Sequence, residues 1–171
     1  MQIRLFGLAN DSIVDGPGIR FAVFAQGCIH NCEGCHNPNS HDLNGGYFED
    51  CDEIIAKIKA NPLLDGVTFS GGEPFLQAKE LAYISSEVKN TGLSTMAYTG
   101  FTFEELVKGA NAENGWKEFL QTLDLLVDGK FILAEKSIEL NFKGSKNQRI
   151  IDVQKSLKEG KIMLSELDDT H

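Results

Sequence analysis

Residues 20–35, RFAVFAQGCIHNCEGC, decide how the rest of the sequence is interpreted. The first seven, residues 20–26, are mostly apolar and rich in β-prone side chains, which predicts a buried strand. A glycine ends this strand, and Cys28 follows it directly. Two more cysteines, Cys32 and Cys35, come within the next seven residues. The segment therefore predicts a strand that delivers three thiols to one loop.

Strands and helices are expected to alternate along the rest of the chain. Further strands are predicted at 67–70, 93–98, 124–127 and 149–153, and helices at 52–60, 76–90 and 103–122, the last broken near 111–115. Such alternation indicates a parallel sheet with helical crossovers. A closed eight-fold barrel takes about 250 residues, and this chain has 171. We therefore expect an α/β fold of the partial (β/α) barrel type, a short curved parallel sheet with helices on the outside.

The chemistry-bearing residues follow the predicted strands. Cys28, Gly71, Thr99 and Asp128 each come at a strand end. The carboxyl ends of parallel strands meet at one edge of the sheet, where ligands bind in this class of fold. These four loops predict one site.

Length, composition and charge indicate the domain organisation, the class of partner and the location of the protein. We expect a single domain over residues 1–165 and a flexible acidic tail over residues 166–171. The formal charge of −9 argues against a nucleic-acid partner. No stretch approaches the roughly eighteen apolar residues of a membrane span, and a secretory signal is not evident. The expected location is the cytoplasm, where cysteines rarely form disulfides.

The clustered cysteines suit a metal centre. Thiolate sulfur is a soft donor that binds zinc or iron–sulfur clusters. A structural zinc site takes four ligands, usually from two separated pairs, whereas three cysteines cluster here and Cys51 stands apart. Three thiolates on a four-iron cluster leave one iron open to a cofactor. Zinc remains an alternative on the cysteines alone, with His30, His36 or His41 as its fourth ligand.

A second motif, Ser70-Gly71-Gly72-Glu73-Pro74, follows the next predicted strand. As an isolated peptide it is an ordinary turn. Together with the C-x3-C-x2-C spacing it resembles the signature of the radical S-adenosylmethionine superfamily, which carries GGEP at this place. The resemblance implies a [4Fe–4S] cluster held by Cys28, Cys32 and Cys35, with S-adenosylmethionine as the second cofactor. It favours this cluster over zinc.

Four further segments indicate which family of this superfamily the chain resembles. They are residues 15–20 (DGPGIR), 34–38 (GCHNP), 126–131 (LVDGKF) and 144–149 (GSKNQR). With them the chain is most similar to the family of anaerobic ribonucleoside-triphosphate reductase activating proteins, which are glycyl-radical-enzyme activases. The resemblance extends over residues 15–152, most of the chain.

The resemblance implies an enzyme, a radical S-adenosylmethionine oxidoreductase. Its cluster would pass one electron to S-adenosylmethionine and break a carbon–sulfur bond, giving methionine and a 5′-deoxyadenosyl radical. This radical would take a hydrogen atom from one glycine of the large subunit of the anaerobic ribonucleotide reductase. The electron would come from a donor such as flavodoxin or ferredoxin. No catalytic residue beyond the cluster ligands is expected, since the homolysis needs no general acid or base.

The same resemblance assigns cofactor-binding roles. Gly71, Gly72 and Glu73 are expected to hold the ammonium group of S-adenosylmethionine. The adenosyl part is expected to lie near Gly34, Cys35 and His36. Four further candidates, each of which could instead order a loop or strand end, are Asp128, Lys130, Asn147 and Arg149.

Two other functions compete with this interpretation. Activases of the pyruvate formate-lyase type share the DGPG and GGEP segments. A non-catalytic iron–sulfur or zinc-binding module, such as an electron carrier, would use the same cysteines. Carriers usually close all four metal positions with protein ligands, however, and have no use for GGEP.

Overall fold

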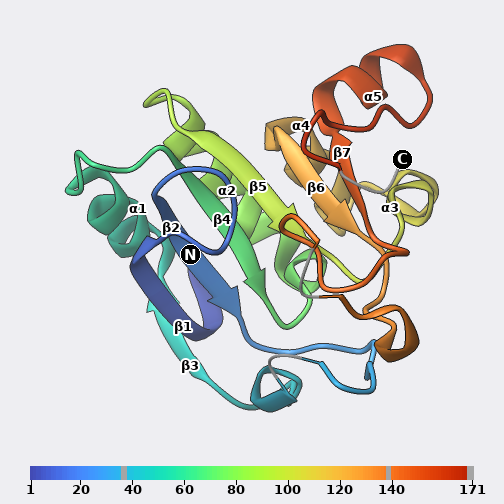
Figure 1. Ribbon diagram of the computed structural model, residues 1–171. Coiled ribbons are helices and arrows are strands. Elements are labelled where there is room, and N and C mark those ends of the chain that lie inside the picture. The colour runs from blue at the N-terminus through green and yellow to red at the C-terminus, as the bar shows by residue number, and fades with distance from the viewer. Residues whose placement is uncertain (36–37, 138–139, 169–171) are drawn as a thin grey trace.

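The computed structural model describes residues 1–35, 38–137 and 140–168 (Figure 1). Its strands are β1 (Gln2–Ser12), β2 (Arg20–Ala25), β3 (Tyr47–Asp50), β4 (Gly66–Gly71), β5 (Ser94–Tyr98), β6 (Leu125–Asp128) and β7 (Arg149–Asp152). Its α-helices are α1 (Cys51–Lys59), α2 (Ala78–Lys89), α3 (Phe103–Gly109), α4 (Trp116–Thr122) and α5 (Val153–Glu159). Three short 3-10 helices are η1 (Pro38–Ser40), η2 (Pro74–Gln77) and η3 (Leu133–Glu135).

The described strands form one open sheet in the order β3-β1-β2-β4-β5-β6-β7. The central strands β2, β4, β5 and β6 are parallel neighbours. The outer strands β1, β3 and β7 each pair antiparallel with their neighbours. The expected α/β fold of the partial-barrel type is thus confirmed, with a sheet that is parallel at its centre and antiparallel at both edges.

The strands and helices predicted at the centre of the chain are present with small shifts of their ends. The predicted break in the helix over 103–122 separates α3 from α4, where the side chain of Asn114 accepts from the backbone N–H of Trp116 at 3.1 Å. Strands β1 and β3 and helix α5 were not predicted. Strand β1 has register shifts between Leu5 and Gly7 and between Ala9 and Ser12. These irregularities interrupt the two-residue period by which a strand is found.

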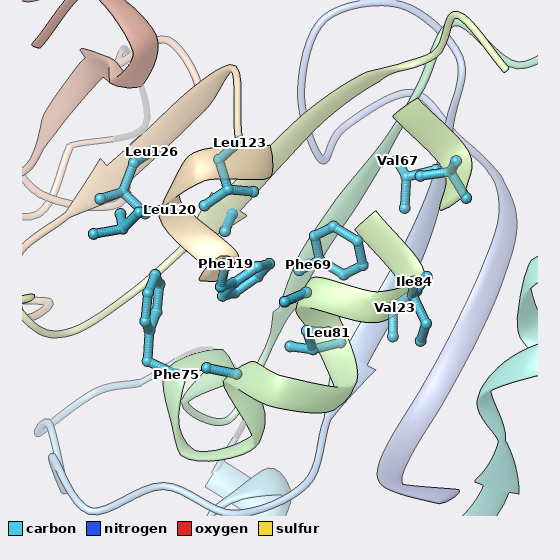
Figure 2. Packing of buried hydrophobic residues seen from close by; sticks show 14 of the residues in the cluster. Val23, Val67, Phe69, Phe75, Leu81, Ile84, Phe119, Leu120, Leu123 and Leu126 are labelled. Carbon is cyan, nitrogen blue, oxygen red and sulfur yellow. The ribbon is translucent and has the colours of Figure 1, made fainter. Parts of the chain in front are cut away.

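One row of side chains crosses the sheet and carries the main core. Val23 pairs with Phe69, Phe69 with Ala97, Ala97 with Leu126, and Leu126 with Ile151. All five belong to the larger core cluster, which also takes in buried residues of α1, α2, α3 and α4. Figure 2 shows helix residues packed against this row, with Phe119 beside Phe69. Burying this row fixes the register of the central strands.

The opposite face of the sheet carries polar and sulfur-containing side chains beside apolar ones. Arg20 of β2 is buried there, and its guanidinium donates to Thr68 Oγ1 at 2.7 Å, to Pro17 O and Ser94 Oγ at 2.9 Å, and to Val67 O and Ser94 O. All five acceptors are uncharged, and burial lowers the pKa of this guanidinium. Arg20 therefore joins β2, β4, β5 and the loop before β2.

The described part of the expected tail lies against the sheet. Asp168 is buried, and its carboxylate accepts from the backbone N–H of Ile150 at 2.8 Å and from Lys143 Nζ at 3.2 Å. Residues 169–171 lie outside the described part of the chain. Among the described residues, we find no helix with the length and apolar character needed to span a bilayer.

Replacing Arg20 tests this framework. Arg20→Met should lower the free energy of unfolding by about 3 kcal/mol, because buried carbonyl groups lose their donor. Urea denaturation of the apoprotein measures the change. Lys57→Met, a matched substitution at an exposed lysine paired with Glu49, should change stability little. Equal effects of the two substitutions would contradict the role given to Arg20.

Candidate functional site

The cysteine loop begins where β2 ends, at the carboxyl edge of the parallel strands (Figure 1). Ser40 and His41, which follow the last cysteine, lie against the start of the loop. The backbone N–H of Gly27 donates to Ser40 O at 2.6 Å, and that of Cys28 donates to His41 O at 3.1 Å. The N–H of Cys35 donates to Cys32 O at 3.3 Å. The loop is therefore a closed unit with its ends joined beside β2.

The three cysteines of this loop are free thiols, half-buried and facing one cavity of about 110 Å³. Burial is the largest cause that raises the pKa of Cys28 and of Cys32 above the ordinary thiol value. Within the described residues, no three His, Cys, Asp or Glu side chains are grouped to hold a single metal ion. The thiols of a four-iron cluster do not share one metal, because each binds its own iron.

The glycines of GGEP allow the backbone of the next loop to approach the cysteine loop. The N–H of Gly72 donates to Ala25 O, and the N–H of Glu73 donates to Gly27 O, both at 2.7 Å. A Cβ on Gly71 would lie 2.5 Å from backbone atoms of Ala25, and one on Gly72 would lie 2.2 Å from Gly27 O. Any larger residue would push the two loops apart.

Glu73 itself is buried, with 1 % of its surface exposed, and its carboxylate is surrounded by donors. Oε1 accepts from Thr99 Oγ1 and from the N–H of Gly100, both at 2.8 Å. Oε2 accepts from the N–H of Phe75 at 2.9 Å and from Thr99 Oγ1 at 2.9 Å. His30 Nε2 lies 2.6 Å from Oε1. A carboxylate this deeply buried is stable only with such a full set of partners.

His30 connects this carboxylate to the cysteine loop, since it stands between the first and second cysteines. The geometry requires Nε2 to donate, because the carboxylate oxygen accepts. The imidazole ring also packs edge-on against Phe101, with ring centroids 4.7 Å apart. One side chain of the cysteine loop is thus fixed to the loops that follow β4 and β5.

A larger cavity of about 380 Å³ opens on the face of the sheet that is opposite the main core. Phe24, Ser70 and Tyr98 of the central strands line it, together with Cys35 and Phe131. It shares Cys35, Tyr98, Phe131 and Gln148 with the cavity of the cysteines. Its volume is within the range of small-molecule sites. A ligand there can reach the cysteine loop.

Asp128 and Arg149, two of the further candidates, pair with each other. Arg149 Nε lies 3.0 Å from Asp128 Oδ1 and Nη2 lies 2.5 Å from Oδ2. Asp128 is buried and also accepts from the N–H of Phe103 at 2.7 Å. The Arg149 guanidinium also bonds the carboxylate of Glu104. The pKa of Arg149 is raised, chiefly by its hydrogen bonds to Asp128. This network joins the end of β6 to β7 and to the start of α3.

The other two further candidates lie in adjacent loops. Asn147 Nδ2 donates to Lys130 O at 2.8 Å, so it holds the backbone after β6. The Lys130 side chain is exposed and lines a cavity with Asn147 and Arg149. Gly34 is exposed, and a Cβ there would meet Leu133 Cδ1 at 2.8 Å. His36 lies outside the described residues.

Comparison with known proteins agrees with this arrangement. A family described as "4Fe-4S single cluster domain" matches residues 14–151. The anaerobic ribonucleoside-triphosphate reductase-activating protein of Vibrio cholerae serotype O1 is 34% identical over 146 residues, which cover 81% of this chain and 90% of that protein. The chain belongs to this family of activating proteins.

Two pyruvate formate-lyase-activating enzymes are also similar to this family member. The enzyme of Clostridium pasteurianum is 38% identical over 114 residues, which cover 61% of this chain and 48% of that enzyme. The enzyme of Staphylococcus aureus (strain USA300) is 34% identical over 165 residues, 92% of this chain and 64% of that enzyme. The family resemblance stated from the sequence is confirmed, and with it the enzyme class and the two expected cofactors.

In this activating protein, the structure adds four residues that the family motifs did not assign, namely Thr99, Gly100, His30 and His41. Thr99 and Gly100 bond Glu73, and His41 Nε2 lies 3.3 Å from Cys35 Sγ. In the sequence, Thr99 was marked only by its place after a predicted strand. His30 and His41 were marked only by their proximity to the cysteines in the sequence, and their partners Glu73 and Cys35 depend on tertiary contacts.

The His30–Glu73 contact predicts coupling between the two loops. His30→Gln and Glu73→Gln should each destabilise the apoprotein by about 2 kcal/mol, and the double variant should lose about 1–3 kcal/mol less than their sum. Thermal and urea unfolding of the four proteins gives this difference. Glu33→Gln, at an exposed position of the same loop, serves as the control. Strict additivity of the two losses would contradict the contact.

Proposed function

We propose that this protein cleaves S-adenosylmethionine with a [4Fe–4S] cluster and thereby forms the glycyl radical of an anaerobic ribonucleoside-triphosphate reductase. The observation that carries the proposal is the fixed contact between the cysteine loop and the GGEP turn. His30 and the N–H of Glu73 tie the two together at the edge where the parallel strands end. A ligand bound at GGEP is thereby held beside the thiols.

The residues present suit a four-iron cluster with one open iron. Cys28, Cys32 and Cys35 supply three soft sulfur donors in one half-buried loop. The fourth cysteine, Cys51, is buried at the start of α1, in the main core. Its pKa is raised by burial to about 11, as expected for an inert thiol. Three ligands on four irons leave a site for the amino and carboxylate groups of S-adenosylmethionine.

When bound, the cluster supplies the electron that cleaves S-adenosylmethionine and so makes available the radical that takes hydrogen from glycine. The chain is proposed to position the cofactor beside the thiols. The GGEP backbone at Gly71 and Gly72 is proposed to meet the ammonium group with its carbonyl oxygens. Since the Glu73 carboxylate accepts from protein donors, its proposed role is to hold this turn beside the cysteines.

The remaining cofactor contacts are proposed along the larger cavity. Gly34, Cys35 and His36 would lie near the adenosyl group. Lys130 and Asn147 would lie toward the carboxylate or ribose. Asp128 and Arg149, which bond each other, would support this wall of the site.

The partner, the electron source and the location are also proposals. The relatives that this chain matches over nine tenths of their length are named for the anaerobic reductase, and its large subunit is the proposed substrate. A flavodoxin or ferredoxin would deliver the electron. Free cysteines suit the reducing cytoplasm.

Iron binding by cysteine variants tests which of the four cysteines hold the cluster. Cys28→Ala, Cys32→Ala and Cys35→Ala should each fail to retain a four-iron cluster after anaerobic reconstitution, whereas Cys51→Ala should retain it. Iron and sulfide content together with electron paramagnetic resonance of the reduced protein measure this. In the wild type, S-adenosylmethionine should change the spectrum, because it binds the open iron. A cluster that ignores S-adenosylmethionine would overturn the proposal.

The target enzyme distinguishes this function from a second candidate. The match to the Staphylococcus aureus pyruvate formate-lyase-activating enzyme covers 92% of this chain, which makes a formate-lyase the alternative substrate. The reduced protein, S-adenosylmethionine and either partner are mixed, and the glycyl radical signal is recorded. We expect the signal with the reductase. A signal with the formate-lyase alone would reassign the target.

A further inference from the structure

His41 contacts two of the three cysteines from outside the motif that contains them. Its backbone carbonyl accepts from the N–H of Cys28 at 3.1 Å, and its Nε2 lies 3.3 Å from Cys35 Sγ. Both contacts come from one half-buried residue that follows η1. His41 also lines the cavity that the cysteines share.

The chemistry of the two groups decides the direction of the contact. A cysteine sulfur bound to iron is a thiolate, which only accepts hydrogen bonds. The imidazole nitrogen next to it must then carry the hydrogen. Hydrogen bonds to a ligating sulfur draw charge from it, and they are among the factors that set the potential of an iron–sulfur cluster.

We infer that His41 donates a hydrogen bond from Nε2 to the Cys35 thiolate and thereby raises the reduction potential of the cluster. The inference rests on the proposed function, because it requires Cys35 to be a cluster ligand. Reduction adds negative charge to the cluster and its sulfurs, so a donor at the sulfur stabilises the reduced form more than the oxidised form. His41 is a positioning residue in this role, since it acts through Cys35.

The contact also explains why His41 differs in role from His30. The His30 ring nitrogen is 2.6 Å from the Glu73 carboxylate and is used to join the loops. The His41 ring nitrogen is directed at sulfur instead. The two histidines, His30 between the first two cysteines and His41 after the third, thus contact different partners.

The test is the midpoint potential of the reconstituted cluster without S-adenosylmethionine or reductase, followed by electron paramagnetic resonance. His41→Leu removes the donor. His41→Gln keeps an N–H at nearly the same reach, and His41→Asn shortens it. Asn39→Leu is the matched control, since Asn39 is an exposed residue of the same turn.

We expect His41→Leu to shift the equilibrium between the two cluster states about tenfold toward the oxidised form, a potential lower by about 59 mV for a one-electron couple. His41→Gln and Asn39→Leu should stay near the wild type. If the Leu variant does not hold a cluster, the potential of the Asn variant should lie below that of the Gln variant.

Three results would overturn the inference. In the first, every variant keeps the wild-type potential while its cluster still responds to S-adenosylmethionine; the proposed function then stands and only the role of His41 falls. In the second, Leu and Gln change the spectrum of the cluster equally, which indicates that His41 binds iron. In the third, the wild type holds no cluster, and both proposals fall together.

Discussion

The buried carboxylate of Glu73 is the constraint on which the site depends. An ion at this depth requires several donors. They come from three places along the chain, namely His30 in the cysteine loop, Phe75 in its own turn, and Thr99 with Gly100 after β5. Satisfying one charge therefore fixes three loops relative to each other. The position of the thiols is fixed by the same contacts, because they share a loop with His30.

The same carboxylate contributes to the electrostatics around the thiols. Burial is the main reason that the pKa of Cys28 and Cys32 is raised, and the negative charge of Glu73 raises both further. Negative charge near a cluster disfavours the addition of an electron, and cluster potentials depend on local charge, sulfur hydrogen bonds and exposure. Glu73 and His41 thus act in opposite directions on the same centre, one as a nearby charge and the other as a donor to sulfur.

The sequence was sufficient for the centre of the fold and for placing the three clustered cysteines in one loop at the strand ends. The rows of apolar residues in β2, β4, β5 and β6 have the pattern of buried strands, and the spacing of the cysteines places all three in the loop after β2. The edge strands were missed, because β3 has four residues and β1 carries two register shifts. The partners of Glu73, Asp128 and Arg149 could not be foreseen either. Each depends on which loops the sheet brings together, and the motif residues turned out to bond one another.

The separation of these partners along the chain governs when the site can form. His30 and Glu73 are 43 residues apart, and Glu73 and Gly100 are 27 apart. Arg20 reaches Ser94 across 74 residues. Contacts of such long sequence separation form slowly, because the chain must first close the intervening loops. During synthesis, the cysteines emerge well before β5, so the nascent chain carries its thiols for some time without the frame that orients them. The three thiols therefore reach their final relative geometry only after the sheet has folded.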